Sequence, residues 1–331
     1  MPKEKIKKAL IIGISGQDGA YLAKLLLAKG YEVHGTSRDA DISSFYGLKK
    51  LDIYYKIKLH SMSLVDFRSV MQTILQIMPD EIYNLAGQTS VGLSFLHPVE
   101  TLESISVGTL NILEILRFHK LETKFYNASS SECFGDTNGV KANEQTPFRP
   151  RSPYAVAKSA AFWQVANYRE AYNLFACSGI LFNHESPLRL RRFVTKKIIE
   201  SVYKIAMKEQ DKLVIGNINI SRDWGWAPEY VQAMHLILQQ NKPDDFVIAT
   251  GKQITLEKFI AEAFAYFDLD YKKYLEYDNN LMRPTDILHS SGDASKAKEI
   301  LNWSARYFAE DIIKMMMQSE MINNTNSLIL A

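Results

Sequence analysis

Tyr154 and Lys158 could form an acid–base pair, because they are spaced i and i+4. On a helix, side chains with this spacing lie one above the other on a single face. Free tyrosine has a pKa of about 10, and a nearby cation stabilises its phenolate. Bringing that pKa near 7 takes about three units, or roughly 4 kcal/mol, which a partly desolvated pocket can provide. The same spacing is common on ordinary amphipathic helices, so the pair needs supporting features.

A hydroxyl and a carboxylate precede this pair, in the stretch Ser129-Ser130-Ser131-Glu132 at the end of an apolar run. A serine hydroxyl can donate or accept a hydrogen bond. A carboxylate can accept and donate a proton in general acid–base catalysis. Glu132 could also be a solvated loop carboxylate, so its role depends on its lying beside Tyr154.

Residues 13–19 have the spacing G-x-x-G-x-x-G, between an apolar run and a helical pattern. Glycines at these positions allow a tight turn and let backbone N–H groups approach a pyrophosphate at a helix N-terminus. We expect this turn to bind a dinucleotide, because it follows the first strand of a βαβ unit; the alternative is a merely structural turn. The expected contacts are Gly13, Ser15, Gly16, Gln17, Asp18 and Gly19.

The end of the second strand bears on the choice between NAD and NADP. In an NAD enzyme an acidic residue there hydrogen-bonds to the ribose 2′-hydroxyl. The stretch at 35–39 reads Gly-Thr-Ser-Arg-Asp, and the Arg38 guanidinium suits a 2′-phosphate. Asp39 could neutralise Arg38 or bind the 2′-hydroxyl itself. We therefore predict NADP, with NAD as the alternative.

Short apolar runs alternate with helical periodicity through the first half of the chain. This alternation, with short connections, predicts parallel βαβ units and a doubly wound, Rossmann-like sheet of the α/β class. The expected strands are residues 9–14, 32–36, 81–85, 124–128 and 175–181, and the expected helices are residues 21–29, 64–77, 99–119 and 153–172.

The character of the chain changes near residue 183, where prolines and basic residues punctuate shorter elements. We expect residues 1–182, with returning segments near 220–250, to form the Rossmann domain that binds NADP. Residues 183–331 are expected to form mainly a smaller mixed α/β lobe that binds substrate. Such a lobe would lie over the carboxyl ends of the strands, where open α/β sheets bind ligands.

Composition excludes several classes of protein. The chain has 331 residues and a formal net charge of +2, too small an excess to indicate a nucleic-acid or membrane-surface binder. Its two cysteines, Cys133 and Cys177, are too few for a disulfide framework. The seven histidines are scattered without metal-ligand spacing, so we expect no metal. We expect a cytoplasmic protein.

Taken together, the glycine turn, the hydroxyl cluster and the Tyr154–Lys158 pair resemble the extended short-chain dehydrogenase/reductase family. Within it, longer stretches resemble the GDP-mannose 4,6-dehydratases, and the resemblance runs from about residue 8 to 315. The stretches that carry it are residues 84–86, 152–158, 167–172, 179–187, 193–195, 222–225, 245–251 and 283–285.

The resemblance implies a reaction cycle on a nucleotide sugar. Tyr154 takes the C4 hydroxyl proton while hydride passes from C4 to NADP. Glu132 then takes the acidified C5 proton and assists loss of the C6 hydroxyl as water, and the same hydride returns to C6. Ser130 hydrogen-bonds to the C4 oxygen, and Lys158 holds the ribose and tunes Tyr154.

The resemblance also implies binding residues. Lys197, Arg222 and Arg283 are expected to bind the pyrophosphate of a GDP-sugar, with Asn183 and Glu185 near the sugar. The resemblance places Leu85, Ala86 and His184 beside the cofactor, and we expect His184 to be a packed or hydrogen-bonded histidine rather than an acid. Arg189, Arg191 and Arg192 could join these cations, but for a run of basic residues we favour a solvated face.

Several positions depart from the family pattern. Asp39 stands where a second arginine is usual, and Ser63 stands where an acid is expected after the third strand. The loop at 87–92 lacks the usual His and Lys, and residues 188–192 replace an Arg-Arg-Gly-Glu-Thr-like stretch. These changes concern cofactor preference, sugar identity and subunit contacts.

Three alternatives therefore stay open beside GDP-mannose dehydration. The substrate could be another GDP-linked sugar, such as a heptose. The enzyme could be a GDP-sugar epimerase or 4-ketoreductase, which would not need Glu132. The chain could also be a catalytically silent NADP-binding regulator. For assembly we expect a homodimer or homotetramer, in which the helices at 99–119 and 153–172 pair across a two-fold axis.

Overall fold

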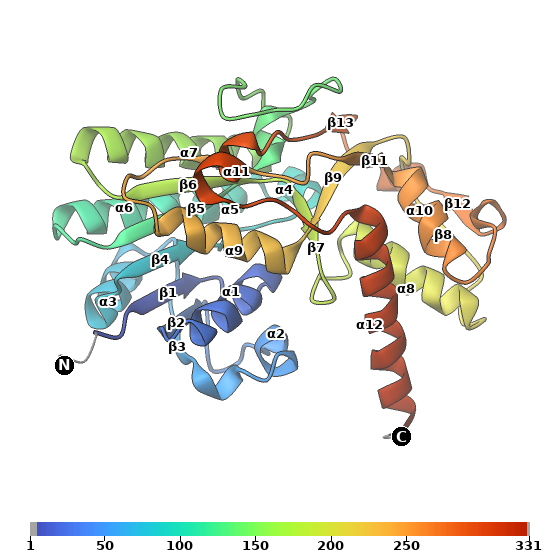
Figure 1. Cartoon of the computed structure of the whole chain (residues 1–331), viewed down its shortest axis with the longest axis horizontal. Helices are drawn as coiled ribbons and strands as arrows, with labels where there is room; N and C mark the ends of the chain where they lie inside the picture. The colour runs from blue at the N-terminus through green and yellow to red at the C-terminus, as the bar shows by residue number, and fades with distance from the viewer. Residues whose placement is uncertain (1–4, 330–331) are drawn as a thin grey trace.

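A parallel sheet of seven strands forms the centre of the molecule. The computed structural model describes the backbone of residues 5–329 and the side chains of residues 5–323. The strand order is β10-β6-β5-β4-β1-β2-β3, and every pairing is parallel. This order confirms the predicted doubly wound α/β sheet (Figure 1). The strands are β1 Lys8–Ile12, β2 Glu32–Ser37, β3 Lys58–Ser61, β4 Glu81–Asn84, β5 Lys124–Ser130, β6 Ala176–Leu181 and β10 Phe246–Ile248.

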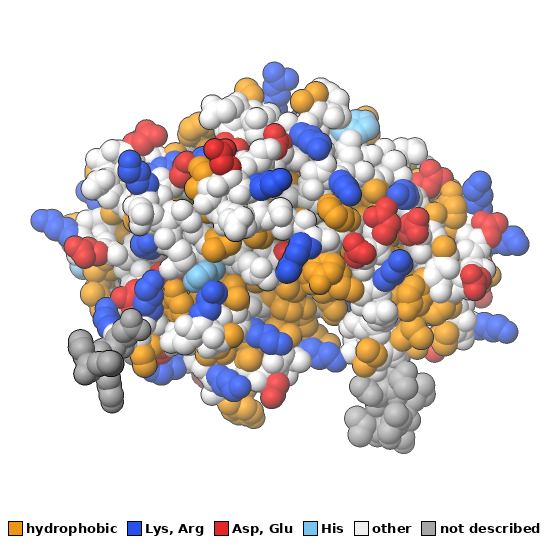
Figure 2. All heavy atoms as spheres, in the orientation of Figure 1, with side chains coloured by type: hydrophobic (Ala, Val, Ile, Leu, Met, Phe, Trp, Pro, Cys, Tyr) orange, Lys and Arg blue, Asp and Glu red, His pale blue; other side chains and the backbone are white. Residues whose placement is uncertain are grey.

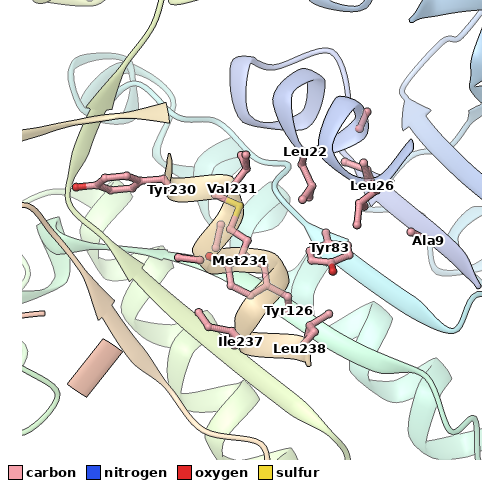
Figure 3. Close-up of a cluster of buried hydrophobic side chains, with 14 of the residues drawn as sticks. Ala9, Leu22, Leu26, Tyr83, Tyr126, Tyr230, Val231, Met234, Ile237 and Leu238 are labelled. Atoms are coloured by element: carbon pink, nitrogen blue, oxygen red, sulfur yellow. The ribbon is translucent and has the colours of Figure 1, made fainter. Parts of the chain in front are cut away.

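Helices pack against both faces of this sheet. The chain's path places α1 and α9 together on one face, and α3, α6 and α7 on the other (Figure 1). Figure 3 shows the core under the first face, where Leu22 and Leu26 of α1 and Met234 of α9 lie near Tyr83 and Tyr126 of the sheet. The helices are α1 Gln17–Ala28, α3 Phe67–Ile77, α6 Gly108–Phe118, α7 Pro153–Tyr172, α9 Ala227–Leu238 and α11 Ser295–Leu301.

Local signals set the ends of the helices that matter for the site. Helix α7 starts where the Ser152 hydroxyl accepts a hydrogen bond from the Ala155 N–H at 3.1 Å, and Pro153 follows as its first residue. It ends at Asn173, which adopts the left-handed conformation. The predicted range of 153–172 is therefore confirmed.

Three expected helices differ from the structure in detail. The helix expected at 21–29 begins earlier, at Gln17, and ends at Ala28. The helix expected at 99–119 is α5 Pro98–Leu102 and α6 joined by a π-helical turn, Glu103–Val107. The helix expected from residue 64 begins at Phe67, because the Asp66 side chain accepts hydrogen bonds from the next backbone N–H groups. The shorter helical elements are α2 Tyr46–Lys50, α4 Val91–Leu96, η1 Tyr54–Lys56 and η3 Ser131–Phe134.

A second, mixed α/β lobe has its own hydrophobic core, formed by residues such as Ile198, Trp224, Phe259 and Met316. Strand β9 pairs with β7, β11 and β13, and β8 pairs with β12. The lobe lies beside the carboxyl ends of β5 and β6 (Figure 1). Its elements are β7 Asn183–Glu185, α8 Val194–Ala206, β8 Leu213–Ile215, β9 Ser221–Trp226, β11 Gln253–Thr255, α10 Leu256–Ala265, η4 Tyr271–Lys273, β12 Leu275–Tyr277, η5 Asn279–Leu281, β13 His289–Ser290 and α12 Ala309–Ile329.

The surface mixes charges of both signs. On the face in Figure 2, Lys and Arg side chains are interspersed with Asp and Glu, in keeping with the net charge of +2. Within residues 5–329, no helix has both the length and the apolar character that a membrane span requires.

Candidate active site

A cavity of about 620 Å³ lies between the carboxyl ends of the main sheet and the second lobe. This is where open α/β sheets bind ligands. The structure brings most of the predicted site residues together on its walls. They are Asp18, Leu85, Ser130, Glu132, Tyr154, Lys158, Asn183, His184, Glu185, Lys197, Arg222 and Arg283. Those that do not line it are Gly13, Ser15, Gly16, Gln17, Gly19, Arg38 and Ala86.

The predicted reacting groups come from the end of β5 and the first turns of α7. Strand β5 ends at Ser130, whose hydroxyl accepts a hydrogen bond from the Glu132 N–H at 3.3 Å and so starts η3. On α7, the Lys158 Nζ lies 5.9 Å from the centre of the Tyr154 ring and donates to the Ala128 carbonyl at 2.7 Å. The phenol, the ammonium and the carboxylate therefore face one cavity.

Burial governs the proton affinities of Tyr154 and Lys158. Burial raises the pKa of Tyr154, and a hydrogen bond with Ser130 opposes this only in part. Burial also lowers the pKa of Lys158 to about 8, against the attraction of Cys133 and Asp18. The expected lowering of the Tyr154 pKa is therefore not a property of the chain alone, because desolvation of the phenolate outweighs the Ser130 hydrogen bond and the Arg189 charge.

Glu132 faces two arginines. Burial raises the pKa of Glu132, although the Arg222 and Arg283 guanidinium groups act in the opposite direction, and Asp286 adds to the rise. Arg222 is 4% exposed, and its Nη1 donates to the carbonyls of Ser221 at 3.0 Å and Ile287 at 2.7 Å. A carboxyl group with a raised pKa can both accept and donate a proton near neutral pH.

The glycine turn fits a dinucleotide. Gly13 has a φ of +88°, and a Cβ there would lie 2.9 Å from the backbone of Ala86. A Cβ on Gly19 would lie 2.6 Å from the Gly13 carbonyl oxygen. Gly16 caps α1 without a side-chain hydrogen bond in the described chain, so the first N–H groups of the helix stay open to an anion. The Asp18 Oδ1 atom, buried in the same wall, has no hydrogen-bond partner among the described residues.

His184 and Gln17 join the turn to the second lobe. The His184 Nε2 lies 2.8 Å from Asp18 Oδ2, and its Nδ1 lies 2.8 Å from the Phe182 carbonyl oxygen. The ring also stacks on Tyr230, with ring centres 4.5 Å apart. Gln17 donates to the His184 carbonyl at 2.9 Å. His184 thus has the packed, hydrogen-bonded position that its sequence context predicts.

Arg38 lies outside the cavity, at the end of β2. Its side chain is 89% exposed, and its Nη1 is 4.0 Å from the Glu100 Oε1. The Asp39 carboxylate accepts hydrogen bonds from the Asp41 N–H at 2.9 Å and the Ile42 N–H at 3.2 Å. The Asp39 carboxylate is therefore hydrogen-bonded within its own turn, and the carboxylate that lies beside Arg38 is that of Glu100.

The basic run after β7 is not a uniform solvated face, which corrects the expectation for part of it. Arg191 is exposed and pairs with Glu200 at 3.1 Å. Arg189, in contrast, is largely buried in the cavity wall, where its Nε lies 3.1 Å from the Glu185 Oε2, and Arg192 also lines the cavity. Sequence patterning could not separate these arginines, because a run of like charges carries no sign of a buried partner.

Asp286 is a cavity residue that sequence reasoning missed. Its Oδ1 lies 3.3 Å from Arg222 Nη2 and 3.7 Å from Arg283 Nη1. The one signal in the sequence was its place directly after the Arg283-Pro284-Thr285 stretch. Among the described residues, no group of three His, Cys, Asp or Glu side chains is placed to hold a metal ion.

The family model described as GDP-mannose 4,6 dehydratase matches residues 10–316. The Arabidopsis thaliana protein named GDP-mannose 4,6 dehydratase 2 is 46% identical over 331 residues, which cover 96% of this chain and 88% of that protein. The Homo sapiens GDP-mannose 4,6 dehydratase is 41% identical over 94% of this chain and 91% of its own length.

Solved structures match across nearly the whole chain. The dTDP-glucose 4,6-dehydratase of Bacillus anthracis in complex with NAD has a TM-score of 0.83 and 17% identity, over 96% of this chain and 98% of that chain. RMD from Pseudomonas aeruginosa, complexed with NADPH, has a TM-score of 0.80 and 20% identity, over 96% and 99%. These likenesses concern the fold, while the sequence matches concern the family. The chain belongs to the GDP-mannose 4,6-dehydratase family.

Proposed function

We propose that this enzyme converts GDP-mannose to GDP-4-keto-6-deoxymannose with loss of water. The observation that carries the proposal is that the Tyr154 phenol and the Glu132 carboxylate line the same cavity. A dehydratase needs both groups, because it must take a hydroxyl proton at C4 and a carbon-bound proton at C5. Membership of the family supports the same substrate.

The glycine turn and Lys158 would hold a nicotinamide dinucleotide, and the chemistry it would supply is reversible hydride transfer between C4 and C6 with no net oxidation. Tyr154 accepts the C4 hydroxyl proton, and Ser130 hydrogen-bonds to the C4 oxygen. The C4 ketone acidifies the C5 proton, which Glu132 accepts and delivers to the departing C6 hydroxyl, giving water. The proton held by Tyr154 balances the final protonation of C5.

The raised pKa of Tyr154 bears on when the first proton moves. Because burial disfavours the phenolate in the chain alone, we propose that Tyr154 accepts the C4 proton only with the oxidised cofactor bound. Lys158 then serves mainly to fix the ribose and the ring of Tyr154. The pH profile of turnover should therefore differ from that of the phenol in the free enzyme.

The cofactor we propose is NADP, with NAD as the alternative. Arg38 is exposed at the end of β2, and the Asp39 carboxylate is engaged by its own turn. Calorimetric titration of the protein with NADP⁺ and NAD⁺ tests this choice. The Arg38→Ala variant should lose affinity for NADP⁺ about tenfold and keep its affinity for NAD⁺. Equal losses for both would exclude a 2′-phosphate contact.

We propose that Lys197, Arg222 and Arg283 bind the pyrophosphate of the substrate and that Asn183 and Glu185 lie near the sugar. All five line the cavity on the side of the second lobe. The same assignment divides the chain into two domains. Residues 1–182 and the returning segments near 220–250 form the domain that binds the cofactor, and residues 183–331 mainly form the domain that binds the GDP-sugar.

Incubation of the purified protein with GDP-mannose and a trace of NADP⁺ tests the main proposal. We expect a 4-keto-6-deoxy sugar, seen by mass spectrometry as loss of one water, without net reduction of the cofactor. Steady accumulation of NADPH would instead identify a simple dehydrogenase. Product formed without loss of water would identify an epimerase.

A second candidate is dehydration of another GDP-linked sugar, such as a heptose. Ser90 and Gly92, small residues in the loop that lacks the family's usual His and Lys, line the cavity. A comparison of kcat/KM for GDP-mannose and a GDP-heptose decides between them. A ratio above ten in favour of the heptose would replace the first candidate.

We propose a homodimer or homotetramer as the working assembly. Helices α5 and α7 pack side by side and expose apolar side chains, including Val99 at 67%, Val156 at 48% and Trp163 at 61%. Exposed apolar surface of this kind favours a subunit interface. Light scattering should show an oligomer for the wild type. The Trp163→Glu variant should dissociate at higher protein concentrations, because a charge at the interface weakens the subunit contact.

A further inference from the structure

One carboxylate oxygen bridges two guanidinium groups in the cavity wall. The Asp286 Oδ1 lies 3.3 Å from the Arg222 Nη2 and 3.7 Å from the Arg283 Nη1. The Asp286 side chain is 20% exposed, and those of Arg222 and Arg283 are 5% and 35% exposed. Charges at this depth are screened much less than charges on an open surface. The three groups therefore act as one electrostatic unit.

The backbone holds this unit beside the segment that carries Glu132. Asp286 accepts a hydrogen bond from the Ile287 N–H at 3.0 Å, which fixes its carboxylate. The next residue, Leu288, donates its N–H at 2.6 Å to Asp136, which follows η3. On the other side, the Thr285 hydroxyl donates at 2.5 Å to the Arg151 carbonyl, just before α7. The segment 285–288, which carries Asp286, is thus tied to the chain beside both elements that carry the reacting groups.

The two arginines differ in how much they depend on Asp286. Arg222 also donates to two backbone carbonyls, so its guanidinium keeps its place without the carboxylate. For Arg283, Asp286 is the ion-pair partner that the described residues provide. Loss of Asp286 should therefore free Arg283 and leave Arg222 in position but uncompensated.

The charges that face Glu132 oppose one another. Arg222 from β9 and Arg283 from the segment after η5 favour the carboxylate, while Asp286 and burial favour the protonated form. Tyr154 from α7 is another ionisable side chain that interacts with Glu132. The other titratable groups that line the cavity are Asp18, Lys158, His184, Glu185, Arg189, Arg192 and Lys197.

We propose that Asp286 is a positioning residue of the reaction, a carboxylate that fixes Arg283 beside Arg222 and balances their charge next to Glu132. The inference rests on the proposed dehydratase function, in which Glu132 must first accept and then donate a proton. Two uncompensated guanidinium groups would lower the pKa of Glu132 and weaken its acid role.

The test measures the protonation of Glu132 without turnover. Protein labelled with ¹³C at the glutamate carboxyl carbons is titrated by NMR, and Glu132→Gln assigns the resonance. In Asp286→Asn, whose side-chain oxygen can still accept from the Ile287 N–H, we expect the pKa of Glu132 to fall by about half a unit, a roughly threefold change. Asp286→Glu should restore most of the wild-type value.

A second variant keeps the proposal testable should Asp286→Asn fail to fold. Arg283→Met removes a positive charge and should move the pKa of Glu132 upward, and the double variant should lie between the two single ones. Asp293→Asn, which removes a carboxylate outside the cavity lining, is the matched control. An unchanged pKa in both cavity variants, or an equal shift in the control, would overturn the proposal.

Kinetics add a readout that a purely structural role would not move. The acidic limb of the kcat profile should shift downward in Asp286→Asn by the same half unit, while the melting temperature stays within a few degrees. If wild-type protein fails to dehydrate GDP-mannose, the proposed function is wrong. The NMR titration still decides whether Asp286 balances the arginines.

Discussion

The two walls of the cavity are built in different ways. The sheet wall consists of Asp18, Glu132, Tyr154 and Lys158, which follow the ends of β1 and β5 or lie on the adjoining helix α7. The lobe wall consists of Lys197, Arg222, Arg283 and Asp286, which come from α8, β9 and a loop after η5. In the proposed function, proton transfer belongs to the sheet wall and anion recognition to the lobe wall.

The two walls also differ in how burial affects their charged groups. On the sheet wall, burial dominates, since it raises the pKa of Tyr154 and lowers that of Lys158 to about 8. On the lobe wall, Arg222 is buried too, but an opposite charge and backbone carbonyls compensate it. The lobe also has its own core, so its charges can be altered without repacking the sheet.

The largest test of this division is Glu132→Gln, because Glu132 is the sheet-wall residue that faces the lobe wall. We expect kcat for GDP-mannose to fall about 10³-fold with KM nearly unchanged, since the amide keeps the shape but cannot accept the C5 proton. Steady-state kinetics beside the Asp293→Asn control give the comparison. Intact turnover would favour an epimerase or 4-ketoreductase instead.

Lys158→Met tests whether burial dominates the sheet wall. The pKa of Lys158 falls from 10.5 to about 8 on folding, so the unfolded chain binds the proton more tightly between those values. The ammonium therefore destabilises the fold at pH 7, and this penalty disappears as the pH rises from 8 to 10.5. Relative to Lys158→Met, the wild type should gain about 2 kcal/mol between pH 7 and 9.5.

The measurement is urea unfolding of both proteins without cofactor at several pH values. Other titrating groups cancel in the difference between the two chains. A constant difference across this range would mean that the Lys158 ammonium is not desolvated. Burial would then no longer distinguish the charged groups of the sheet wall from those of the lobe wall.

Most of the main sheet and the sheet wall could be predicted from the sequence, because both rest on local signals. Apolar runs, the glycine turn and the i, i+4 spacing are readable without contacts between distant residues. The apolar pattern gave no signal for strand β3, because Lys-Leu-His-Ser at 58–61 has one apolar residue and its position at the sheet edge leaves it partly exposed. The family resemblance alone placed a third strand before Ser63. The π-helical turn at 103–107 leaves the helical periodicity on either side intact, so it gave no signal.

The lobe wall could not be derived from spacing. Arg222 and Asp286 are 64 residues apart, and only the pairing of β9 with the segment around β13 brings them together. Resemblance to a family supplied the three cations, but not the carboxylate that joins two of them. Similarly, Arg189 could not be distinguished from its exposed neighbour Arg191, because burial depends on the path of the second lobe.

Within the lobe wall, Arg283→Ala and Arg222→Ala should behave differently. Arg283 is 35% exposed, so its removal should raise KM for GDP-mannose about tenfold and leave the melting temperature unchanged. Arg222 is buried against Asp286 and two carbonyls, so its removal should also lower the melting temperature. Thermal unfolding and kinetics on the same samples separate the two effects. Equal losses of stability would mean that both arginines are structural.

The smallest expected effect concerns Glu100, which lies outside both walls and 4.0 Å from the Arg38 guanidinium. If Arg38 binds a 2′-phosphate, the nearby carboxylate competes for the same cation, and Glu100→Gln should tighten NADP⁺ binding about threefold, the scale of an exposed ion pair. NAD⁺ lacks the 2′-phosphate and should bind unchanged. Calorimetry with both dinucleotides measures the ratio, and repeating it at high salt should shrink the gain, because exposed charges are screened. An equal gain in affinity for NADP⁺ and NAD⁺ would mean that Glu100 does not act through a 2′-phosphate contact. Arg38 would then have no role in the choice between the two cofactors.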